Sequence, residues 1–431
     1  MSILIMGTGY VGLTTAIMFA ELGVQATGFD SNAAKIALLN QGYVPFYENG
    51  MEPLLQRHLA ERTIRFVQDE QTAIEEHSII FLCVGTPSNS DGSANLFAIK
   101  QASEWIGKYM REQTLVVIKS TVPVGVDERV SEWIASKLTK PIPFDVVVNP
   151  EFLREGSAVA DALAPDRIVV GSDSEEAAQR LLSLYAKIDC PKIVTNPKAA
   201  IMIKYASNAF LATKISFVNE LARLCDGLGI DISVIANGMG LDPRIGGMFL
   251  KAGIGYGGSC FPKDVDALLH TASANRKRLS IIEHAAVVNR TQPLHALDVW
   301  ERVMPSTFKK ATVAILGLSF KPHTDDLREA PSLVVISELL SRQAKVRVHD
   351  PIAVLPVHFR ALGVQQSDTI EETLQGADAV ILCTEWPEYK RIDWVALKPV
   401  LNGHIVFDGR NALDGRSLIR SGYEYFGISS H

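Results

Sequence analysis

Short apolar runs recur along the first 170 residues, and each one stops at small or polar residues. The clearest are "ILIM" at 3–6, "IIFLC" at 79–83, "TLVVI" at 114–118 and "DVVV" at 145–148. Continuous apolar runs of this kind are typical of parallel strands buried on both faces. A glycine turn and a helical pattern follow the first run, and "RIVVG" at 167–171 reads as a further strand. The pattern predicts a doubly wound α/β domain.

A much longer helical pattern occupies residues 198–226. It contains no proline, its apolar residues recur at intervals of three and four, and Gly227 and Gly229 mark its end. We predict one long helix that links two halves of the chain. Lys204 and Asn208 are four residues apart on it and share a face. A solvated polar pair is the alternative, but the apolar and small neighbours of Lys204 favour burial at a site.

The C-terminal third repeats the N-terminal pattern. "TVAILGLSFKP" parallels "SILIMGTGYVG", "KVRVHDP" parallels "VQATGFD", and "ADAVILC" parallels "HSIIFLC". We therefore predict an α/β protein with two Rossmann-like doubly wound domains joined by a long central helix. The expected domains are 1–196, 197–300 and 301–431.

Composition narrows the class of protein. The chain has 431 residues, of which 47% are hydrophobic and 21% are charged, and its net charge is −6. This ordinary globular composition, without a basic run, argues against a nucleic-acid binder. The N-terminus has no cationic start or small-residue cleavage site, and no apolar run is long enough to cross a bilayer. A soluble cytoplasmic protein without a membrane partner is expected.

A dinucleotide-binding motif follows the first predicted strand. Gly7, Gly9 and Gly12 form GxGxxG between a strand and a helix, and Asp30 lies about 20 residues further on. Glycines let backbone N–H groups approach a pyrophosphate at the helix N-terminus. Asp30 would accept the ribose hydroxyls and repel a 2′-phosphate, which predicts NAD as the cofactor. A glycine-rich turn without a ligand is the alternative.

Other candidate residues follow the predicted strands. Thr86, Thr121 and Glu151 each come just after an apolar run, and ligands bind beyond the carboxyl ends of such strands. These three residues should therefore line one crevice. The second doubly wound domain lacks GxGxxG, so we expect it to bind something other than a dinucleotide, for example a nucleotide-sugar, unless it is purely structural.

One of the five cysteines differs from the others. The odd count and wide spacing do not suggest disulfides, and no Cys/His cluster suggests a metal site. Cys83 and Cys383 end apolar runs and Cys225 lies on the long helix, so these three are predicted to be packing residues. Cys260 lies in "GIGYGGSCFPKD", among glycines and charges. A reactive thiol is expected there, with a buried inert thiol as the alternative.

Motifs through nearly the whole chain carry a family resemblance. They are "GTGYVGL", "CVGTP", "STVPVG", "NPEFLREGSAV", "PDRIVVG", "KYASNAFLATKISFVNE", "DPRIG", "FLKAGIGYGGSCFPKD" and "DGRN". Together they resemble the UDP-glucose 6-dehydrogenase family. Sister families that act on GDP-mannose and UDP-N-acetylmannosamine share the fold and the cysteine, but "FLREGSAV" and "GGSCFPKD" look most like the glucose branch. Asn49 stands where that branch is expected to have proline.

The resemblance implies NAD-dependent oxidation of UDP-glucose to UDP-glucuronate, and the chemistry agrees with a cysteine. Oxidising a primary alcohol to an acid removes four electrons, while NAD carries two. The intermediate aldehyde cannot give a second hydride until a nucleophile adds to it. Addition of the Cys260 thiolate gives a thiohemiacetal, and its oxidation gives a thioester for water to hydrolyse. Pro262 suits a helix start, and a helix N-terminus together with Lys204 would lower the pKa of the thiol.

The resemblance also implies roles for the residues around Cys260. Lys204 and Asn208 would stabilise oxyanions at C6 of the sugar. Asp264, on the same helical face as Cys260, would position a water with Thr121. Glu151 is the candidate general base, and an N-cap or salt-bridge role is the alternative.

Further contacts are implied by the same resemblance. The expected cofactor contacts are Gly7, Gly9, Tyr10, Val11, Gly12, Asp30, Lys35, Thr86, Thr121, Glu155, Lys263 and Arg328. The expected substrate contacts are Glu151, Phe152, Leu153, Arg154, Glu155, Lys204, Asn208, Arg244, Phe249, Leu250, Lys251, Ala252, Gly253, Gly257, Cys260, Lys321 and Arg410. Arg244 would reach the neighbouring subunit's sugar site, so a homodimer or higher homo-oligomer is expected. A catalytically silent NAD-binding regulator and an enzyme for another nucleotide-sugar remain as alternatives.

Overall fold

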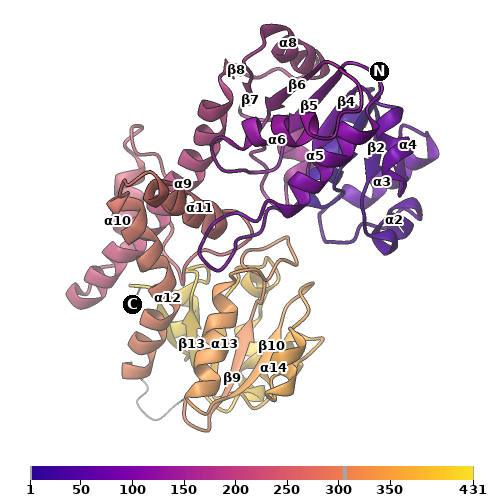
Figure 1. Ribbon diagram of the computed structural model, residues 1–431. Coiled ribbons are helices and arrows are strands. Elements are labelled where there is room, and N and C mark those ends of the chain that lie inside the picture. Colours follow the sequence, from indigo (N-terminus) through magenta and orange to yellow (C-terminus); the bar gives the residue numbers. More distant parts are fainter. Residues whose placement is uncertain (1, 304–307, 431) are drawn as a thin grey trace. The chain divides into compact units, whose positions relative to one another are not determined.

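The computed structural model describes residues 2–303 and 308–430, which form two compact units (Figure 1). The first unit runs to Ser207 and also includes Asp266–Arg278. The second unit contains Asn208–Val265 and the chain from Leu279 onward. The division falls inside two helices, α9 (Pro197–Leu228) and α11 (Phe261–Ala274). The three-part division at residues 196 and 300 stays a prediction.

The first unit is built on an eight-stranded sheet in the order β3-β2-β1-β4-β5-β6-β7-β8. All neighbouring strands pair in parallel except β6 and β7, which are antiparallel. The strands are β1 (Ser2–Met6), β2 (Gln25–Phe29), β3 (Ile64–Val67), β4 (Ile79–Leu82), β5 (Thr114–Ile118), β6 (Phe144–Val148), β7 (Ile168–Gly171) and β8 (Lys192–Thr195). The order of the first six strands is that of a dinucleotide-binding Rossmann sheet.

Eight helices connect these strands, with α2 and α3 following each other between β2 and β3. They are α1 (Tyr10–Glu21), α2 (Ala33–Asn40), α3 (Met51–Ala60), α4 (Glu70–Glu75), α5 (Phe97–Tyr109), α6 (Val126–Ala135), α7 (Ala158–Leu163) and α8 (Glu175–Leu184). Three of them begin at a side chain that accepts a hydrogen bond from a first-turn N–H: Asn32, Asp69 and Ser174. Such caps satisfy backbone donors that a helix start otherwise leaves unpaired.

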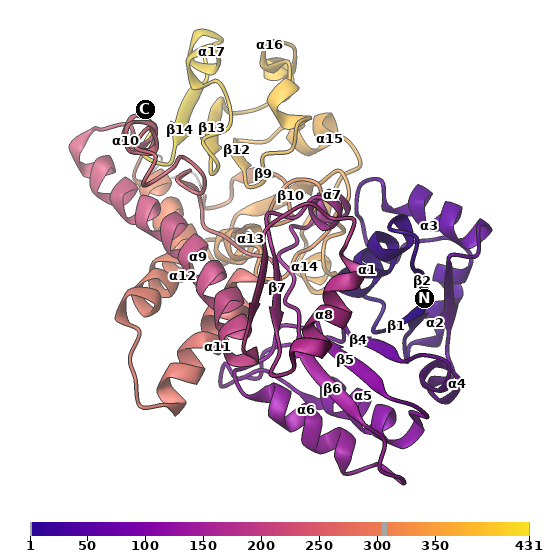
Figure 2. The same cartoon turned by 90° about the horizontal axis from the view of Figure 1, so that it is seen from above.

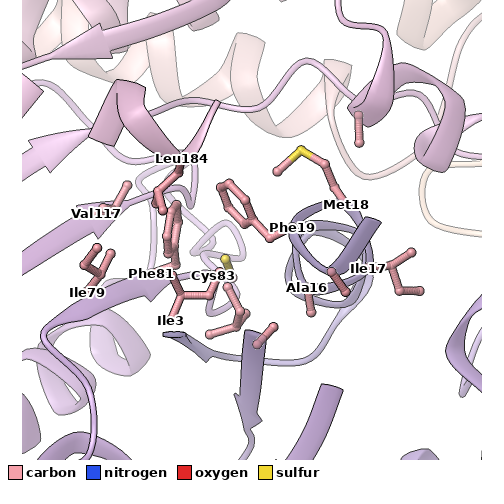
Figure 3. Close-up of a cluster of buried hydrophobic side chains, with 14 of the residues drawn as sticks. Ile3, Ala16, Ile17, Met18, Phe19, Ile79, Phe81, Cys83, Val117 and Leu184 are labelled. Carbon is pink, nitrogen blue, oxygen red and sulfur yellow. The ribbon is translucent and has the colours of Figure 1, made fainter. Parts of the chain in front are cut away.

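The core of the first unit forms where α1 and α8 pack on the sheet. Figure 3 shows Phe19 of α1 close to Phe81 of β4, and their ring centroids are 5.2 Å apart. Leu184 and Val117 extend the same cluster, and both are buried. Every residue of β4 and β5 is buried, as the continuous apolar runs predict.

The second unit repeats the topology with six parallel strands in the order β11-β10-β9-β12-β13-β14. They are β9 (Thr312–Leu316), β10 (Lys345–His349), β11 (Gln365–Gln366), β12 (Ala379–Leu382), β13 (Ile405–Asp408) and β14 (Glu424–Gly427). Its further helices are α10 (Ile232–Gly240), α12 (Ser280–Val303), α13 (Pro331–Ser341), α14 (Val357–Ala361), α15 (Ile370–Leu374), α16 (Trp394–Leu397) and α17 (Gly415–Arg420), with 3₁₀ turns η1 (Tyr389–Arg391) and η2 (Lys398–Val400). The predicted second doubly wound domain is confirmed.

The long helix is also confirmed. α9 begins one residue before and ends two residues after the predicted 198–226 segment, and Figure 2 shows its course. Within the part of the chain that the structure describes, no helix combines the length and apolar character that a membrane span requires. Cys83, Cys225 and Cys383 are buried, as predicted for packing residues.

Candidate active site

The turn between β1 and α1 and the first turn of that helix hold the three glycines of the predicted dinucleotide motif. Gly7 has φ +96° and donates its N–H to the Phe29 carbonyl. A Cβ on Gly12 would lie 1.8 Å from the Gly7 carbonyl oxygen, so only glycine fits there. A Cβ on Gly9 would meet nothing within 4 Å. The turn is therefore packed on its protein side and open at Gly9, beside the N-terminus of α1, which favours an anion.

Asp30 lies at the carboxyl end of β2 and is nearly buried. Its Oδ2 accepts hydrogen bonds from the Thr8 N–H and hydroxyl. The same oxygen forms an ion pair with Lys35, whose Nζ lies 2.7 Å away. Burial alone would raise the pKa of Asp30, but Lys35 and the N–H groups of Asn32 and Thr8 lower it below its usual value. The group is thus an ionised acceptor beside the glycine turn, and Lys35, a predicted cofactor contact, lies next to it.

The residues after β4, β5 and β6 gather at one edge of the first sheet, because these strands are neighbours. The Thr86 hydroxyl donates to the Thr121 carbonyl at 2.8 Å. Glu151 follows β6 and is 7% exposed. The predicted crevice residues therefore share the edge at which doubly wound sheets bind ligands.

Glu151 and Lys204 form a buried ion pair. Lys204 Nζ lies 2.9 Å from Glu151 Oε1, and the Leu153 N–H donates to Glu151 Oε2 at 2.6 Å. Burial would raise the pKa of Glu151, but the Lys204 ammonium, the Leu153 N–H and the Lys119 ammonium together lower it. Glu151 is therefore ionised at neutral pH. The salt-bridge role that the sequence left as an alternative is present, and the role of general base stays a prediction.

Sequence reasoning missed a polar group behind this ion pair. Lys119 is 7% exposed and donates to Asn149 Oδ1, which also accepts the Tyr185 hydroxyl at 2.7 Å. Burial, the largest influence, lowers the pKa of Lys119. Together with Glu151 these residues line a cavity of about 90 Å³. The position of Lys119 directly after β5, two residues before Thr121, could have identified it.

In the second unit, the predicted site residues Asn208 and Asp264 are in contact, which the sequence did not indicate. Asn208 Nδ2 donates to Asp264 Oδ2 at 2.6 Å, and Lys263 Nζ lies 2.7 Å from Asp264 Oδ1. The Asp264 N–H donates to the Cys260 carbonyl, so Cys260 precedes the first turn of α11. Its thiol is half-buried and lies 3.6 Å from the Ser259 hydroxyl. The predicted helix start is confirmed, and a helix N-terminus stabilises a thiolate.

The glycines before Cys260 have a reason that the sequence did not reveal. A Cβ on Gly257 would lie 2.2 Å from the Glu329 carbonyl oxygen. The segment therefore needs glycine to pack against its own unit. Close approach to a sugar, which the sequence suggested as the reason, stays a prediction.

Several predicted substrate residues line one small pocket of the second unit. The pocket has a volume of about 70 Å³ and is lined by Ile215, Asn219, Lys251, Ala252, Gly253, Gly255, Glu385 and Arg410. Sequence reasoning missed Asn219 and Glu385. Among the described residues, Asn219 Nδ2 has no hydrogen-bond partner, and it is buried. This donor is therefore available to an oxygen atom in the pocket.

Arg410 holds backbone as well as lining the pocket. Its guanidinium donates to the carbonyls of Cys383 and Gly255, both at 2.7 Å, and of Phe320 at 3.2 Å. These three contacts hold the guanidinium in place, so Arg410 is not merely solvated. Lys321 Nζ lies 5.5 Å from the Phe320 ring centroid. Leu250 is buried, and Phe249 has φ +65°.

The loop after β6 is held by Glu48, which sequence reasoning also missed. Glu48 accepts hydrogen bonds from the N–H groups of Gly156 and Ala158 and from the Tyr10 hydroxyl at 2.5 Å. Glu155 directly precedes Gly156 in this loop. The predicted cofactor residue Tyr10 is thereby joined to the predicted substrate loop. Asn49, the departure from the family pattern, directly follows Glu48.

Other predicted contacts pack or pair locally. Val11 and Leu153 pack against the core of the first unit. Arg154 pairs with Asp161, Arg244 with Asp242 and Arg328 with Asp326. The Arg167 guanidinium lies 3.7 Å from the Phe152 ring centroid. Among the residues that the structure describes, no group of three or more His, Cys, Asp or Glu side chains could hold a metal ion.

Family models match three successive parts of the chain. Residues 1–189 match the NAD binding domain of the UDP-glucose/GDP-mannose dehydrogenase family, residues 198–291 match its central domain, and residues 314–415 match its UDP binding domain.

Similar proteins span the full length. UDP-glucose 6-dehydrogenase YwqF of Bacillus subtilis (strain 168) is 43% identical over 430 residues, which cover 99% of this chain and 97% of that protein. A UDP-glucose dehydrogenase structure from the hyperthermophilic archaeon Pyrobaculum islandicum has a TM-score of 0.92 and 38% identity, covering 100% of this chain and 98% of the other. A UDP-D-ManNAc dehydrogenase structure from Pyrococcus horikoshii has a TM-score of 0.89 and 28% identity, covering 100% and 99%. The chain therefore belongs to the UDP-glucose/GDP-mannose dehydrogenase family, and it is an NAD-dependent oxidoreductase.

Proposed function

We propose that this protein oxidises UDP-glucose to UDP-glucuronate in two NAD-dependent steps, with a thiohemiacetal and then a thioester on Cys260. The observation that carries the proposal is the half-buried thiol at the start of α11, one turn before the buried Asp264–Asn208 pair. The names of the relatives that are 38% to 43% identical support UDP-glucose as the substrate.

NAD fits the first unit. The open side of the glycine turn at Gly9 and the α1 N-terminus suit its pyrophosphate, and Asp30 offers an ionised acceptor for ribose hydroxyls. Lys35 would give up its contact with Asp30 or share it with the ribose. When bound, NAD accepts one hydride in each of the two oxidations.

In the first oxidation the C6 hydroxyl loses its proton and C6 loses a hydride, which leaves an aldehyde. Lys204 and Asn208 lie one turn apart on α9 and would stabilise negative charge on the C6 oxygen. Asp264 would hold the water that accepts the proton. Its position in the first turn of α11 and its bond to Asn208 support this role.

In the second oxidation the Cys260 thiolate adds to C6, so that an S–C bond forms and the carbonyl π bond breaks. Loss of a second hydride from C6 gives the thioester. Water then attacks C6, the C–S bond breaks, and the thiolate is restored. Glu151 would take the proton of that water. Its pairing with Lys204 supports a switch, because movement of Lys204 toward the C6 oxygen would let burial raise the pKa of Glu151.

The proposal is tested by the ratio of NADH to sugar. The protein is incubated with limiting UDP-glucose, GDP-mannose, UDP-N-acetylmannosamine or UDP-galactose, and NADH and uronate are quantified. We expect two NADH per UDP-glucose and little turnover of the others. One NADH per sugar would contradict the thioester mechanism. Faster oxidation of another nucleotide-sugar would identify that sugar as the substrate in place of UDP-glucose. No oxidation of any sugar would favour a silent regulator.

We predict a strong preference for NAD over NADP. The ionised carboxylate of Asp30 would repel a 2′-phosphate, so kcat/KM should favour NAD by about 100-fold or more. Asp30→Ala should narrow this gap, because Lys35 remains to pair with the phosphate. The double variant Asp30→Ala/Lys35→Ala should use NADP less well than Asp30→Ala does, because it lacks the lysine that would pair with the phosphate. Equal use of both cofactors by the unchanged protein would exclude this role for Asp30.

We also propose that the protein is a homodimer or a higher homo-oligomer. Phe210, Phe217 and Leu224 are 65%, 47% and 60% exposed and lie at seven-residue intervals on α9, so they share one face. Ile281 of α12 is 76% exposed. Such a row of large apolar side chains is typical of a helix that pairs with another copy.

Arg244 supplies the test of a shared site. Its side chain is 87% exposed and contacts Asp242 of the same loop, so it is accessible to a neighbouring subunit. Arg244→Ala and Cys260→Ala should each be inactive alone. A 1:1 mixture that exchanges subunits should recover about one quarter of wild-type activity, since half of the dimers are hybrids and one of their two sites is intact. No recovery after proven exchange would assign Arg244 to its own subunit.

A further inference from the structure

The segment from Gly253 to Gly258 connects the small pocket of the second unit to Cys260. Lys251–Gly253 and Gly255 line the pocket, and Cys260 follows two residues after Gly258. The segment has no helix or strand of its own. Its backbone groups therefore need partners from outside the segment.

Three amide side chains supply several of these partners. Asn219 of α9 accepts the Gly253 N–H at 2.9 Å, and Gln292 of α12 donates to the Gly253 carbonyl at 3.0 Å. Asn289 of α12 accepts the Tyr256 N–H at 2.8 Å and donates to the Tyr256 carbonyl at 3.0 Å. The N–H and the carbonyl of Gly253 and of Tyr256 therefore each have a side-chain amide as hydrogen-bond partner, in place of the backbone partner that a strand would supply. Figure 2 shows α9 and α12, which are joined by the Arg223–Gln292 contact.

The orientation of two amides is fixed by their partners. Arg223 Nε donates to Gln292 Oε1 at 2.9 Å, so the Gln292 NH₂ must face Gly253. Asn289 spans both the N–H and the carbonyl of one residue, so its oxygen and nitrogen cannot exchange places. Gln292 and Asn219 are fully buried, where a lost hydrogen bond is not replaced by water.

We propose that Asn219, Asn289 and Gln292 form an amide clamp that fixes the distance between the pocket and the Cys260 thiol. The clamp holds the segment at Gly253, in the pocket wall, and at Tyr256, four residues before the thiol. Its members are positioning residues, since they act through the segment. The consequence for catalysis rests on the proposed function, because it requires the sugar to be held in the pocket while C6 meets Cys260.

Isosteric variants test the clamp. Asn289→Asp keeps the acceptor for the Tyr256 N–H but turns an oxygen toward the Tyr256 carbonyl. Gln292→Glu keeps the acceptor for Arg223 but turns an oxygen toward the Gly253 carbonyl. Each should lower kcat by about 10- to 100-fold, because displacement of a reacting group by about 1 Å has that cost. KM for NAD should not change. Asn402→Asp is the matched control, since its amide donates to the Gly376 carbonyl on an exposed surface.

Thiol reactivity separates positioning from simple stability. The rate at which iodoacetamide alkylates Cys260, measured without substrate well below the unfolding temperature, should change at least threefold in both clamp variants and stay constant in Asn402→Asp. A lower Tm with unchanged kcat and alkylation would overturn the proposal. This readout is independent of the sugar, so it still tests the clamp if UDP-glucose is not oxidised.

The unchanged protein gives a second test in case a variant does not fold. Hydrogen exchange of the peptide that covers residues 250–260 should be slow without any ligand, as slow as that of α12. Fast exchange there in the otherwise protected protein would show that the amides do not hold the segment, and would overturn the proposal.

Discussion

Replacing Cys260 with alanine should abolish UDP-glucuronate formation, with a fall in kcat of roughly 10⁴-fold or more, as expected when a nucleophile is removed. NAD and UDP-glucose should still bind, because Cys260 is only one of the expected substrate contacts and is not among the expected cofactor contacts. α11 uses the Cys260 carbonyl for its first hydrogen bond, so alanine leaves the helix start intact. Initial-rate assays of NADH and uronate, with calorimetry for binding, measure both effects.

Cys190→Ala is the matched control for this variant, because Cys190 is the other half-buried cysteine of the protein. It should keep wild-type activity. In Glu151→Gln, the slowed hydrolysis should let the acyl-enzyme accumulate. Intact-mass spectrometry would then show the protein heavier by one UDP-glucuronyl group, located in the "GGSCFPKD" peptide. Full activity in Cys260→Ala would leave a mechanism without covalent catalysis.

The fold could be predicted from the sequence because its strands are buried on both faces. Each apolar run from 3–6 onward became a strand of the expected sheet, and α9 was located to within two residues. Gly229, which has φ +67°, directly follows α9, whereas Gly227 lies inside the helix. The contact of Asn208 with Asp264 joins α9 to α11, and neither helical pattern alone indicates it.

Apart from Lys119, whose place after β5 was a usable signal, the parts of the site that were missed carry no local pattern. Gln292 and Asn289 lie on an ordinary amphipathic helix, and only the folded chain shows that their amides meet Gly253 and Tyr256. Likewise, no spacing indicates that Glu48 accepts the N–H groups of a loop more than 100 residues later. Polar side chains that bind backbone far away in the sequence can be recognised only from tertiary contacts. Sequence reasoning therefore finds residues that follow strands or lie in glycine motifs, and it misses these polar side chains.

Removing the charge of Lys204 should impair chemistry more than binding. Lys204→Met keeps the apolar stem but loses the ammonium that would stabilise the C6 oxyanion, so kcat should fall by about 10²- to 10³-fold with little change in KM. It also leaves Glu151 buried without its main cation. Burial then raises the pKa of Glu151, and the acid limb of the pH–rate profile should move to higher pH.

The same change should destabilise the fold in a way that a second substitution relieves. Breaking a buried ion pair from one side costs about 3–5 kcal/mol, because an uncompensated charge stays buried. In Lys204→Met/Glu151→Gln neither charge remains, so the free energy of unfolding at pH 7 should recover most of this loss while kcat stays low. Denaturant unfolding and steady-state kinetics of the three variants separate the two roles. If the double variant regained activity along with stability, or if Lys204→Met had a normal kcat and only a raised KM, Lys204 would serve folding or substrate binding, and the oxyanion at C6 would need another source of positive charge.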